Sequence, residues 1–380
     1  MNSNPFSIVA HSHLRWDFVW QRPQQIFSRL AARHPVLFVE EPMPGEAAPH
    51  LRISEPHPGV FRAIPYLPAG GTHDEGSAEV LALTRRALAT DPLLANRFTN
   101  IVQWFYSPMC APTMLGNLDE VAVVYDCMDE LANFRFAPPD IRAREQLLLR
   151  RADVVFAGGL SLHEAKSREH PNAHFFGCGV DVEHFSQARS PHTAVPPALE
   201  RLPQPVLGYF GVIDERLDYE LIAVLAKAYS QGSIVMAGPV AKVDPAELPK
   251  HPNIHWLGQQ PYSALPALVK GFDVCLMPFA LNEATRYINP TKTLEYLAAG
   301  KPVVSTAIAD VARNFADVVH VAQDYEGFIL GVMSALATPD ETRIARGIER
   351  ANRSTWDSTV AAMRGHLLDA VHGRLALAAA

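Results

Sequence analysis

Residues 289–304 read NPTKTLEYLAAGKPVV, and this stretch has the pattern of a helix that leads into a buried strand. Pro290 presets φ for the first turn of a helix, and Gly300 is a typical residue to end one. The apolar run at 303–306 then predicts the strand. Helices that alternate with buried strands form a parallel sheet covered by helices, so the stretch predicts an α/β domain.

The start of this helix is a candidate phosphate site. The backbone N–H groups near Thr291 and Lys292 have no partner within the helix, and the positive end of the helix dipole lies at the same place. The N–H groups and the dipole both favour binding of an anion. Glu295 lies one turn further on the same face. A carboxylate at that distance from a diphosphate is well placed to accept the two hydroxyls of a ribose. The alternative interpretation is an exposed Lys292 and Glu295 pair that contributes little to stability.

The alternation of strand and helix continues through the chain. In the first half we predict strands at residues 7–10, 36–39, 101–105, 121–125, 154–157 and 174–176, with helices at 23–33, 78–89, 140–151 and 161–170. In the second half we predict strands at 206–210, 233–237, 254–257, 274–278 and 303–306, with helices at 218–229, 262–270, 291–299 and from 325 onward. Two doubly wound α/β domains are therefore expected.

A proline-rich stretch separates the two series. Residues 186–204 follow neither period, and proline fixes φ and removes a backbone donor. We interpret 186–204 as a linker between a first Rossmann-like domain, residues 1–185, and a second, residues 205–354. The helix at 355–373 is expected to pack back on the first domain. Ligands of open α/β sheets bind beyond the carboxyl ends of the strands, so two such domains facing each other form a cleft.

Size and composition agree with two globular domains. A chain of 380 residues is too long for one ordinary core, and 48% hydrophobic against 19% charged residues indicates a globular protein. The net charge of −7, with no run of like charges, argues against a nucleic-acid partner. The basic pairs at 85–86 and 150–151 are interpreted as solvated helix faces, with contact to an anionic membrane surface as the alternative.

The cysteines and the N-terminus indicate a compartment. Four cysteines lie in or beside apolar runs without metal-ligand spacing and are expected to be reduced and buried: Cys110, Cys127, Cys178 and Cys275. The first five residues carry no basic segment followed by an apolar stretch, and no window is apolar enough for a spanning helix. We therefore expect a cytoplasmic protein, with peripheral attachment at the inner face of the membrane left open.

The 289–304 segment resembles the signature of family 4 glycosyltransferases (glycosyl transferases group 1) and their relatives with the GT-B fold. This resemblance implies two Rossmann-like domains facing a cleft, with a nucleotide-sugar diphosphate bound by the second. In that family an acidic residue on this helix holds the nucleotide ribose, which implies that role for Glu295. Thr291 and Lys292 would contact the diphosphate.

A glycine turn carries the same resemblance. Residues 208–211 followed by 214–216 are similar to the family's first strand of this domain and its glycine turn, beyond which a basic side chain meets the distal phosphate. This implies phosphate contacts for Gly211, where a Cβ would keep the backbone away, and for Arg216. Val212 stands where the family often has an arginine.

The nucleotide base has its own candidate residues. Residues 236–239 and 252–258 are similar to the family's strand pair and turn around the base. The resemblance implies base recognition by backbone groups after Leu257, with Tyr262 as a second candidate.

Two positions depart from the family. Its retaining members usually carry a pair of glutamates with seven residues between them, and Tyr287 stands at the first, with Glu283 out of register. Many members also have a histidine where this chain has Asp126, which we place in the loop after the strand at 121–125. Asp126 is a candidate general base, a ligand of a sugar hydroxyl or a helix cap, and its loop position favours function.

The loop at residues 11–23 reads HSHLRWDFVWQRP, and GT-B enzymes place this loop at the mouth of the cleft. An indole face suits a sugar ring and a guanidinium suits an anion, so the loop predicts acceptor binding. Packing of an indole against the sheet is the alternative. The candidate acceptor ligands are Arg15, Trp16 and Arg22, and the candidate bases are His13 and Asp17.

These patterns predict sugar transfer from a nucleotide-diphosphate donor of UDP, GDP or dTDP type to a hydroxyl of a saccharide, a lipid-linked glycan or another cell-surface polysaccharide precursor. The helix start, Lys292 and Arg216 can stabilise the leaving diphosphate, and no Asp-x-Asp element stands at a strand end, so no metal cofactor is expected. The resemblance implies retention, whereas a base at Asp17, His13 or Asp126 would give inversion. The alternatives are a nucleotide-sugar 2-epimerase of the same fold and a non-catalytic nucleotide-sugar-binding partner in a glycan assembly complex.

Overall fold

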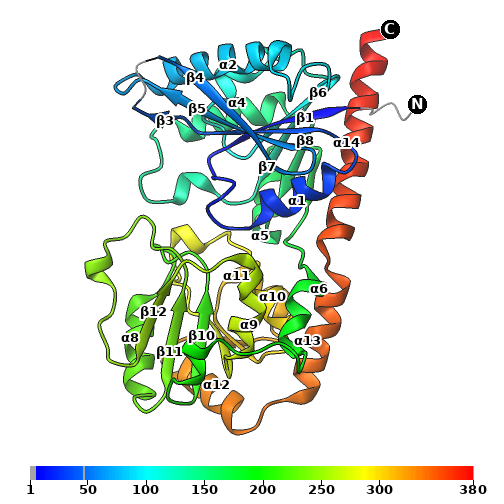
Figure 1. Ribbon diagram of the computed structural model, residues 1–380. Coiled ribbons are helices and arrows are strands. Elements are labelled where there is room, and N and C mark those ends of the chain that lie inside the picture. The colour runs from blue at the N-terminus through cyan, green and yellow to red at the C-terminus, as the bar shows by residue number, and fades with distance from the viewer. Residues whose placement is uncertain (1–5, 46–47, 380) are drawn as a thin grey trace. The chain divides into compact units, whose positions relative to one another are not determined.

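The computed structural model describes residues 6–45 and 48–379, and the chain divides into two compact α/β units. The first unit comprises residues 1–132, 136–177 and 359–380, and the second comprises 133–135 and 178–358. Each unit has its own mainly parallel sheet with helices packed against it, as Figure 1 shows. Both units are Rossmann-like domains, which confirms the predicted fold class.

The sheet of the first unit is parallel except for one edge strand. Among the described residues its strands lie in the order β3-β5-β2-β1-β6-β7-β8-β9, and β4 pairs with β5 antiparallel. Their bounds are β1 (Ser7–Ser12), β2 (Val36–Glu40), β3 (Met43–Pro44), β4 (His50–His57), β5 (Val60–Leu67), β6 (Ile101–Phe105), β7 (Ala122–Cys127), β8 (Val154–Ala157) and β9 (Ala173–Phe175). The chain order reverses between β1 and β6, so their carboxyl ends form the switch point where open α/β sheets bind ligands.

The last helix of the chain packs on the first unit from residue 359 onward. The Nε–H of Arg364 donates to Nε2 of His34 at 2.8 Å, and the ring of His366 stacks on His174 with centroids 3.8 Å apart. The longer helices of this unit are α1 (Arg22–Leu30), α2 (His73–Thr90), α4 (Ile141–Arg151), α5 (Leu160–Lys166) and α14 (Trp356–Ala379), with the short α3 (Ala111–Met114) after β6.

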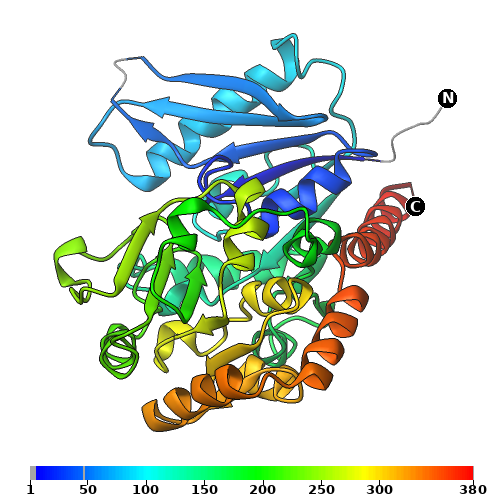
Figure 2. The same cartoon turned by 60° about the horizontal axis from the view of Figure 1, so that its bottom comes forward.

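The sheet of the second unit is entirely parallel over its described strands, in the order β12-β11-β10-β13-β14-β15. The bounds are β10 (Val206–Phe210), β11 (Ser233–Ala237), β12 (Ile254–Gly258), β13 (Val274–Met277), β14 (Val303–Thr306) and β15 (His320–Ala322). The helices are α6 (Val182–Ser186), α7 (Pro197–Glu200), α8 (Tyr219–Ala228), α9 (Leu265–Lys270), α10 (Lys292–Ala298), α11 (Ala309–Phe315), α12 (Tyr325–Ala337) and α13 (Glu341–Arg353). Helix α12 lies against β13, β14 and β15 (Figure 2). Here the order reverses between β10 and β13.

The main difference from the predicted elements lies between residues 40 and 73. No strand is predicted there, whereas β3, β4 and β5 form in that segment. Strand β4 is an edge strand with mostly exposed or half-buried residues, so it lacks a clear apolar face. Pro56 and Pro65 further weaken the strand pattern, because proline in a sheet is confined to edges and irregular positions.

Residues 186–204, interpreted from the sequence as a linker, are part of the second unit in the structure. The segment contains α7, and the side chains of Ala188 and Leu199 are buried in that unit's hydrophobic core. The unit boundary falls instead between Gly177 and Cys178. The few buried residues of this segment follow no regular spacing, so the prolines dominate its sequence pattern.

Two predictions about exposure and membranes have mixed outcomes. Among the described residues no helix combines the length and apolar composition needed to cross a bilayer. The expected absence of a leader concerns residues 1–5, which lie outside the described residues. Cys127 and Cys275 are buried as expected, whereas Cys110 and Cys178 are only half-buried.

Candidate functional site

The switch point of the second sheet holds a glycine turn. Gly211 directly follows β10, has φ +142, and donates its N–H to the carbonyl of Ala237 at 2.8 Å. Gly238 follows the neighbouring β11, and a Cβ there would lie 1.7 Å from the Gly211 carbonyl oxygen. Only glycine permits this close approach of two backbones, so the turn presents main chain rather than side chain at the carboxyl edge of the sheet.

Lys292 lies directly against this turn. A Cβ on Gly211 would lie 2.0 Å from Cε and 2.6 Å from Nζ of Lys292. The ammonium is also 5.7 Å from the centroid of the Tyr209 ring. Burial lowers the pKa of Lys292, while the carboxyl of Glu295 raises it. The structure thus brings together two predicted phosphate contacts that are 81 residues apart in the sequence.

Glu295 is on the first turn of α10, with 8% of its surface exposed. Burial raises the pKa of its carboxyl to about 7, and the nearby Lys292 opposes that rise. Within residues 6–45 and 48–379, the backbone N–H groups of Thr291 and Lys292 meet no hydrogen-bond acceptor. Glu295 is buried and Lys292 is half-buried, so the alternative of an exposed helix pair is wrong.

Arg216 lies in the same unit and is already engaged. Its Nε is 3.0 Å from Oδ1 of Asp214, and its Nη2 is 2.6 Å from Oδ2. The guanidinium also lies 5.8 Å from the ring centroid of Phe134. It is among the groups that lower the pKa of Lys292, after burial. A phosphate contact by Arg216 stays a prediction.

The two residues predicted to bind the nucleotide base already contact other groups of the protein. The carbonyl of Leu257 accepts a hydrogen bond from Nε2 of Gln260 at 3.0 Å. The ring of Tyr262 stacks on His184 with centroids 4.2 Å apart, so one face of the phenol ring is covered. Base contacts by Leu257 and Tyr262 stay predictions, and stacking would need the second face of Tyr262.

Asp126 and Arg22, predicted for separate roles, form one buried ion pair in the first unit. Asp126 is inside β7, so its predicted position in a loop is wrong. It has no exposed surface and accepts hydrogen bonds from Nε and Nη2 of Arg22 at 3.0 and 2.8 Å. Nη1 of Arg22 donates to the carbonyl of Phe176. Arg22 is 2% exposed, so it is enclosed rather than presented to an acceptor.

Trp16 is also a core residue. Its side chain is 4% exposed and makes edge-to-face contacts with Phe38 and Trp20, at centroid distances of 5.2 and 5.9 Å. The predicted stacking of this indole on a sugar ring is therefore wrong, because the packing alternative holds. Arg15 donates to Glu40 at 3.0 Å and to a backbone carbonyl, so its guanidinium is engaged.

The two candidate bases of this loop have different environments. Asp17 is exposed and forms an ion pair with Arg62. His13 is half-buried and lines a pocket in the first unit. Other pocket residues, such as His73 and Met109, come from segments far from the 11–23 loop, and the sequence analysis does not single them out. A sequence feature that could have indicated one wall of the pocket is Thr72, which caps the start of α2.

The described residues contain no group of three or more His, Cys, Asp or Glu side chains arranged to hold a metal ion.

The second unit matches a known protein family. Residues 204–338 fit the family described as "Glycosyl transferases group 1". TuaH of Bacillus subtilis strain 168, named as a glycosyltransferase of teichuronic acid biosynthesis, is 27% identical over 208 residues. These residues are 50% of this chain and 52% of TuaH, so the match spans about half the length of each protein.

Solved structures resemble the whole chain. Sucrose-phosphate synthase from Thermosynechococcus elongatus has a TM-score of 0.72 at 16% identity, over 98% of this chain and all of its own. A trehalose-phosphate synthase from Burkholderia xenovorans in complex with glucose-6-phosphate has a TM-score of 0.69 at 14% identity, over 95% and 100%. An Escherichia coli structure bound with UDP-2-fluoro glucose has a TM-score of 0.67 at 14% identity, over 96% and 99%. The fold is therefore GT-B, and the resemblance to group 1 glycosyltransferases is confirmed. None of these named relatives is an epimerase.

Proposed function

We propose that this chain, whose second unit matches the group 1 glycosyl transferases, moves a sugar from a nucleotide-diphosphate sugar to an acceptor hydroxyl. The observation that carries the proposal is the contact of Lys292 with the Gly211 turn, with buried Glu295 beside it at the switch point of the second sheet. A backbone turn without side chains, a cation and a helix start are what a diphosphate needs.

The leaving diphosphate sets the main electrostatic demand of the reaction. Negative charge develops on its oxygens as the bond to the sugar breaks, and preorganised donors stabilise that charge. Lys292, Arg216 and the N–H groups at the start of α10 would supply these donors, so the proposal needs no metal ion. Retention of configuration is part of the proposal and rests on the family resemblance.

Glu295 would bind the ribose. Its carboxylate can accept hydrogen bonds from both ribose hydroxyls, and its burial excludes competing water. The raised pKa means that the free protein holds this carboxyl partly protonated near pH 7. Ribose binding would then favour release of that proton.

The acceptor would be a saccharide, a lipid-linked glycan or another precursor of a cell-surface polysaccharide. The name of TuaH, with its part in teichuronic acid biosynthesis, supports this class. A cytoplasmic location with peripheral contact at the inner face of the membrane belongs to the same proposal.

A thermal-shift panel of UDP, GDP, dTDP, ADP and their sugars tests the donor site. We expect one nucleotide class to raise Tm clearly, and we expect Glu295→Ala to remove most of that shift. Glu283→Ala is the matched control, because that carboxylate is 74% exposed and forms its ion pair with the exposed Arg286. An unchanged shift in Glu295→Ala would show that the ribose binds elsewhere.

Incubation with the donor then separates transfer from the two alternatives. Sugar transfer gives a glycosylated acceptor only when an acceptor is present. Epimerised donor in the absence of acceptor would contradict the proposal, and so would binding of the donor without turnover or hydrolysis in any acceptor pool.

A further inference from the structure

A pocket of about 370 Å³ lies at the switch point of the first sheet, where β1 and β6 are neighbours. Its walls come from the ends of β1, β2 and β5, from β3, from the loop after β6, from the N-terminal half of α2 and from the end of α3. The volume is at the lower end of the roughly 300–1,000 Å³ that is usual for small-molecule sites. The pocket lies at a switch point, which is where open α/β sheets bind ligands.

Most of the pocket wall is apolar. Thioether side chains contribute at three places, Met43, Met109 and Met114, with Leu67 and Val80 between them. Methionine is flexible and polarisable, so it adapts to ligands of irregular shape. The wall therefore favours a ligand group without hydrogen-bonding atoms of its own.

The polar lining groups are largely occupied or neutral. Nε2 of His11 donates to Oε1 of Gln103 at 2.8 Å, and Oγ of Ser12 bonds both backbone groups of Leu14. Burial lowers the pKa of His11 to about 4 and raises the pKa of the Cys110 thiol to about 12. At neutral pH both side chains are therefore uncharged.

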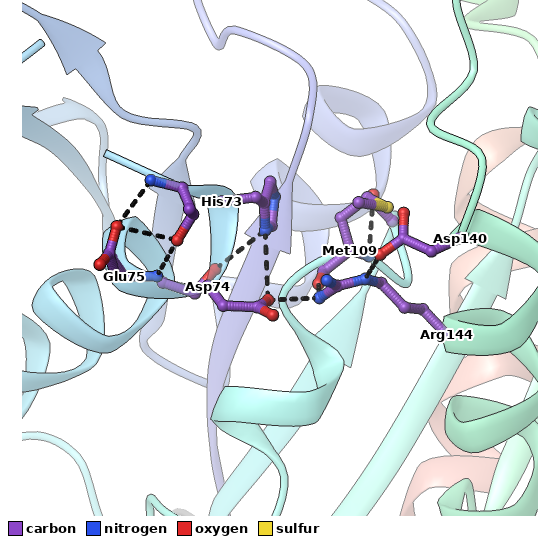
Figure 3. Close-up of polar contacts among 9 residues, drawn as sticks. His73, Asp74, Glu75, Met109, Asp140 and Arg144 are labelled. Carbon is purple, nitrogen blue, oxygen red and sulfur yellow. Dashed lines mark hydrogen bonds and ion pairs between the residues drawn. The ribbon is translucent and has the colours of Figure 1, made fainter. Parts of the chain in front are cut away.

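No lysine or arginine is among the described residues that line the pocket, whereas Glu40 and Glu41 are. The nearby Arg144 does not line the pocket, and its guanidinium lies between two carboxylates: it donates to Asp74 at 2.7 Å and to Asp140 at 2.6 Å, and to the carbonyl of Met109 at 2.8 Å (Figure 3). These bonds occupy Nε and Nη1 of its guanidinium. Among the described residues, the pocket wall thus offers no arginine or lysine to an anionic ligand.

The start of α2 does not replace the missing cation. Thr72 caps it by accepting a hydrogen bond from the N–H of Glu75, and the Glu75 carboxylate accepts one from the N–H of Thr72. The first turn also carries Asp74 and Glu75, whose negative charges oppose an anion at this helix end.

We propose that this pocket binds an uncharged apolar group of the acceptor, an alkyl chain or an aryl ring, and that it does not bind a sugar phosphate. The inference rests on the proposed transfer reaction and names the acceptor class for it. In this respect the pocket would differ from the structural relative that was solved in complex with glucose-6-phosphate. Among the acceptor classes named above, it selects those with an apolar aglycone, such as lipid-linked glycans.

Titration calorimetry of the full chain with four probes tests the inference: octyl β-glucoside below its micelle concentration, phenyl β-glucoside, methyl β-glucoside and glucose 6-phosphate. We expect the octyl or the phenyl glucoside to bind about tenfold more tightly than methyl β-glucoside, because burial of each methylene strengthens binding. The tighter of the two identifies the apolar group as alkyl or aryl. Equal binding of these three glucosides, or tightest binding of glucose 6-phosphate, would overturn the inference.

Gly76→Leu adds an apolar side chain to the pocket wall at a position that accepts a Cβ. A Cβ at Gly76 meets only Cδ1 of Leu67, at an ordinary 3.5 Å, and leucine is the better helix former. We expect this variant to weaken binding of the apolar glucoside about tenfold. Gly365→Leu on α14, where a Cβ meets nothing within 4 Å, is the control and keeps the affinity.

A folded Gly76→Leu variant with unchanged affinity would overturn the inference, and the four-probe ranking on the unmodified chain decides the matter if that variant does not fold. The nucleotide panel on the same preparation separates the two proposals. Nucleotide stabilisation without binding of either apolar glucoside would overturn the pocket inference alone, whereas no stabilisation by any nucleotide would overturn the donor site.

Discussion

The guanidinium of Arg22 encloses the carboxylate of Asp126 inside the first unit, with Nε and Nη2 both within 3.0 Å of Oδ1. The two residues come from α1 and β7, 104 positions apart. A carboxylate that is fully buried and held in this way is poorly placed to remove a proton from an acceptor. The pair is better explained as a link between α1 and the sheet.

Arg22→Ala should therefore destabilise the protein strongly. It leaves Asp126 as a buried charge without its partner, which typically costs about 3–5 kcal/mol. Chemical denaturation by urea at pH 7 measures the loss. The double variant Arg22→Met with Asp126→Leu should recover much of it, because apolar residues of similar size restore the packing. If the folded Asp126→Asn variant loses far more activity than its loss of stability explains, Asp126 becomes a candidate base again.

Gly211→Ala should weaken nucleotide binding through Lys292. The added Cβ would lie 2.0 Å from Cε of Lys292, so the lysine must leave the turn, and φ +142 is unfavourable for alanine. We expect the thermal shift with the preferred nucleotide to be largely lost, with a stability loss of more than about 1 kcal/mol. Gly45→Ala controls for backbone strain, because φ is +122 there and a Cβ meets nothing within 4 Å. Full nucleotide binding by Gly211→Ala would show that Lys292 is not needed at this position.

The sequence predicts the second unit well because its strands are short apolar runs. The predicted bounds of 206–210, 233–237 and 303–306 agree with β10, β11 and β14. These strands are buried on both faces of the sheet, so each is a continuous apolar run that can be recognised without knowing which strands lie beside it. The edge strand β4 has no such character, because none of its residues is buried and it pairs antiparallel with the adjacent β5.

The candidate site divides in the same way. The proximity of Glu295 and Lys292 can be predicted from the sequence, because the two residues are one helical turn apart. The Arg22 and Asp126 pair is not visible, since only the fold brings α1 beside β7. The burial of Trp16 against Phe38 likewise depends on the packing of β2, so a sequence pattern alone leaves its role open.

Nucleotide affinity should rise with pH through neutrality. The pKa of Glu295 in the free protein is raised to about 7 by burial, and the carboxylate form is the one that accepts both ribose hydroxyls. From pH 6 to pH 8 the fraction of carboxylate, and with it the affinity, should increase about tenfold. Titration calorimetry of the preferred nucleotide diphosphate at a series of pH values measures the profile. Glu295→Gln should bind more weakly and with a flat profile between those limits; a slope retained in this variant would assign the titration to another group.

Acidification should loosen the packing of α14 on the first unit through His34. Burial lowers the pKa of His34 to about 4, and its neutral Nε2 accepts the hydrogen bond from Arg364. The unfolded chain takes up this proton first, so the stabilisation is complete above about pH 6.5 and is lost as the pH falls toward 4, on the order of 2 kcal/mol. Urea unfolding at pH 7, 5.5 and 4.5 measures the decline. His34→Gln should reduce the acid slope but not abolish it, because buried His11 has the same lowered pKa and the same sign. The exposed His192→Gln is the control and should keep the full slope; an identical slope in both variants would exclude His34 as a source.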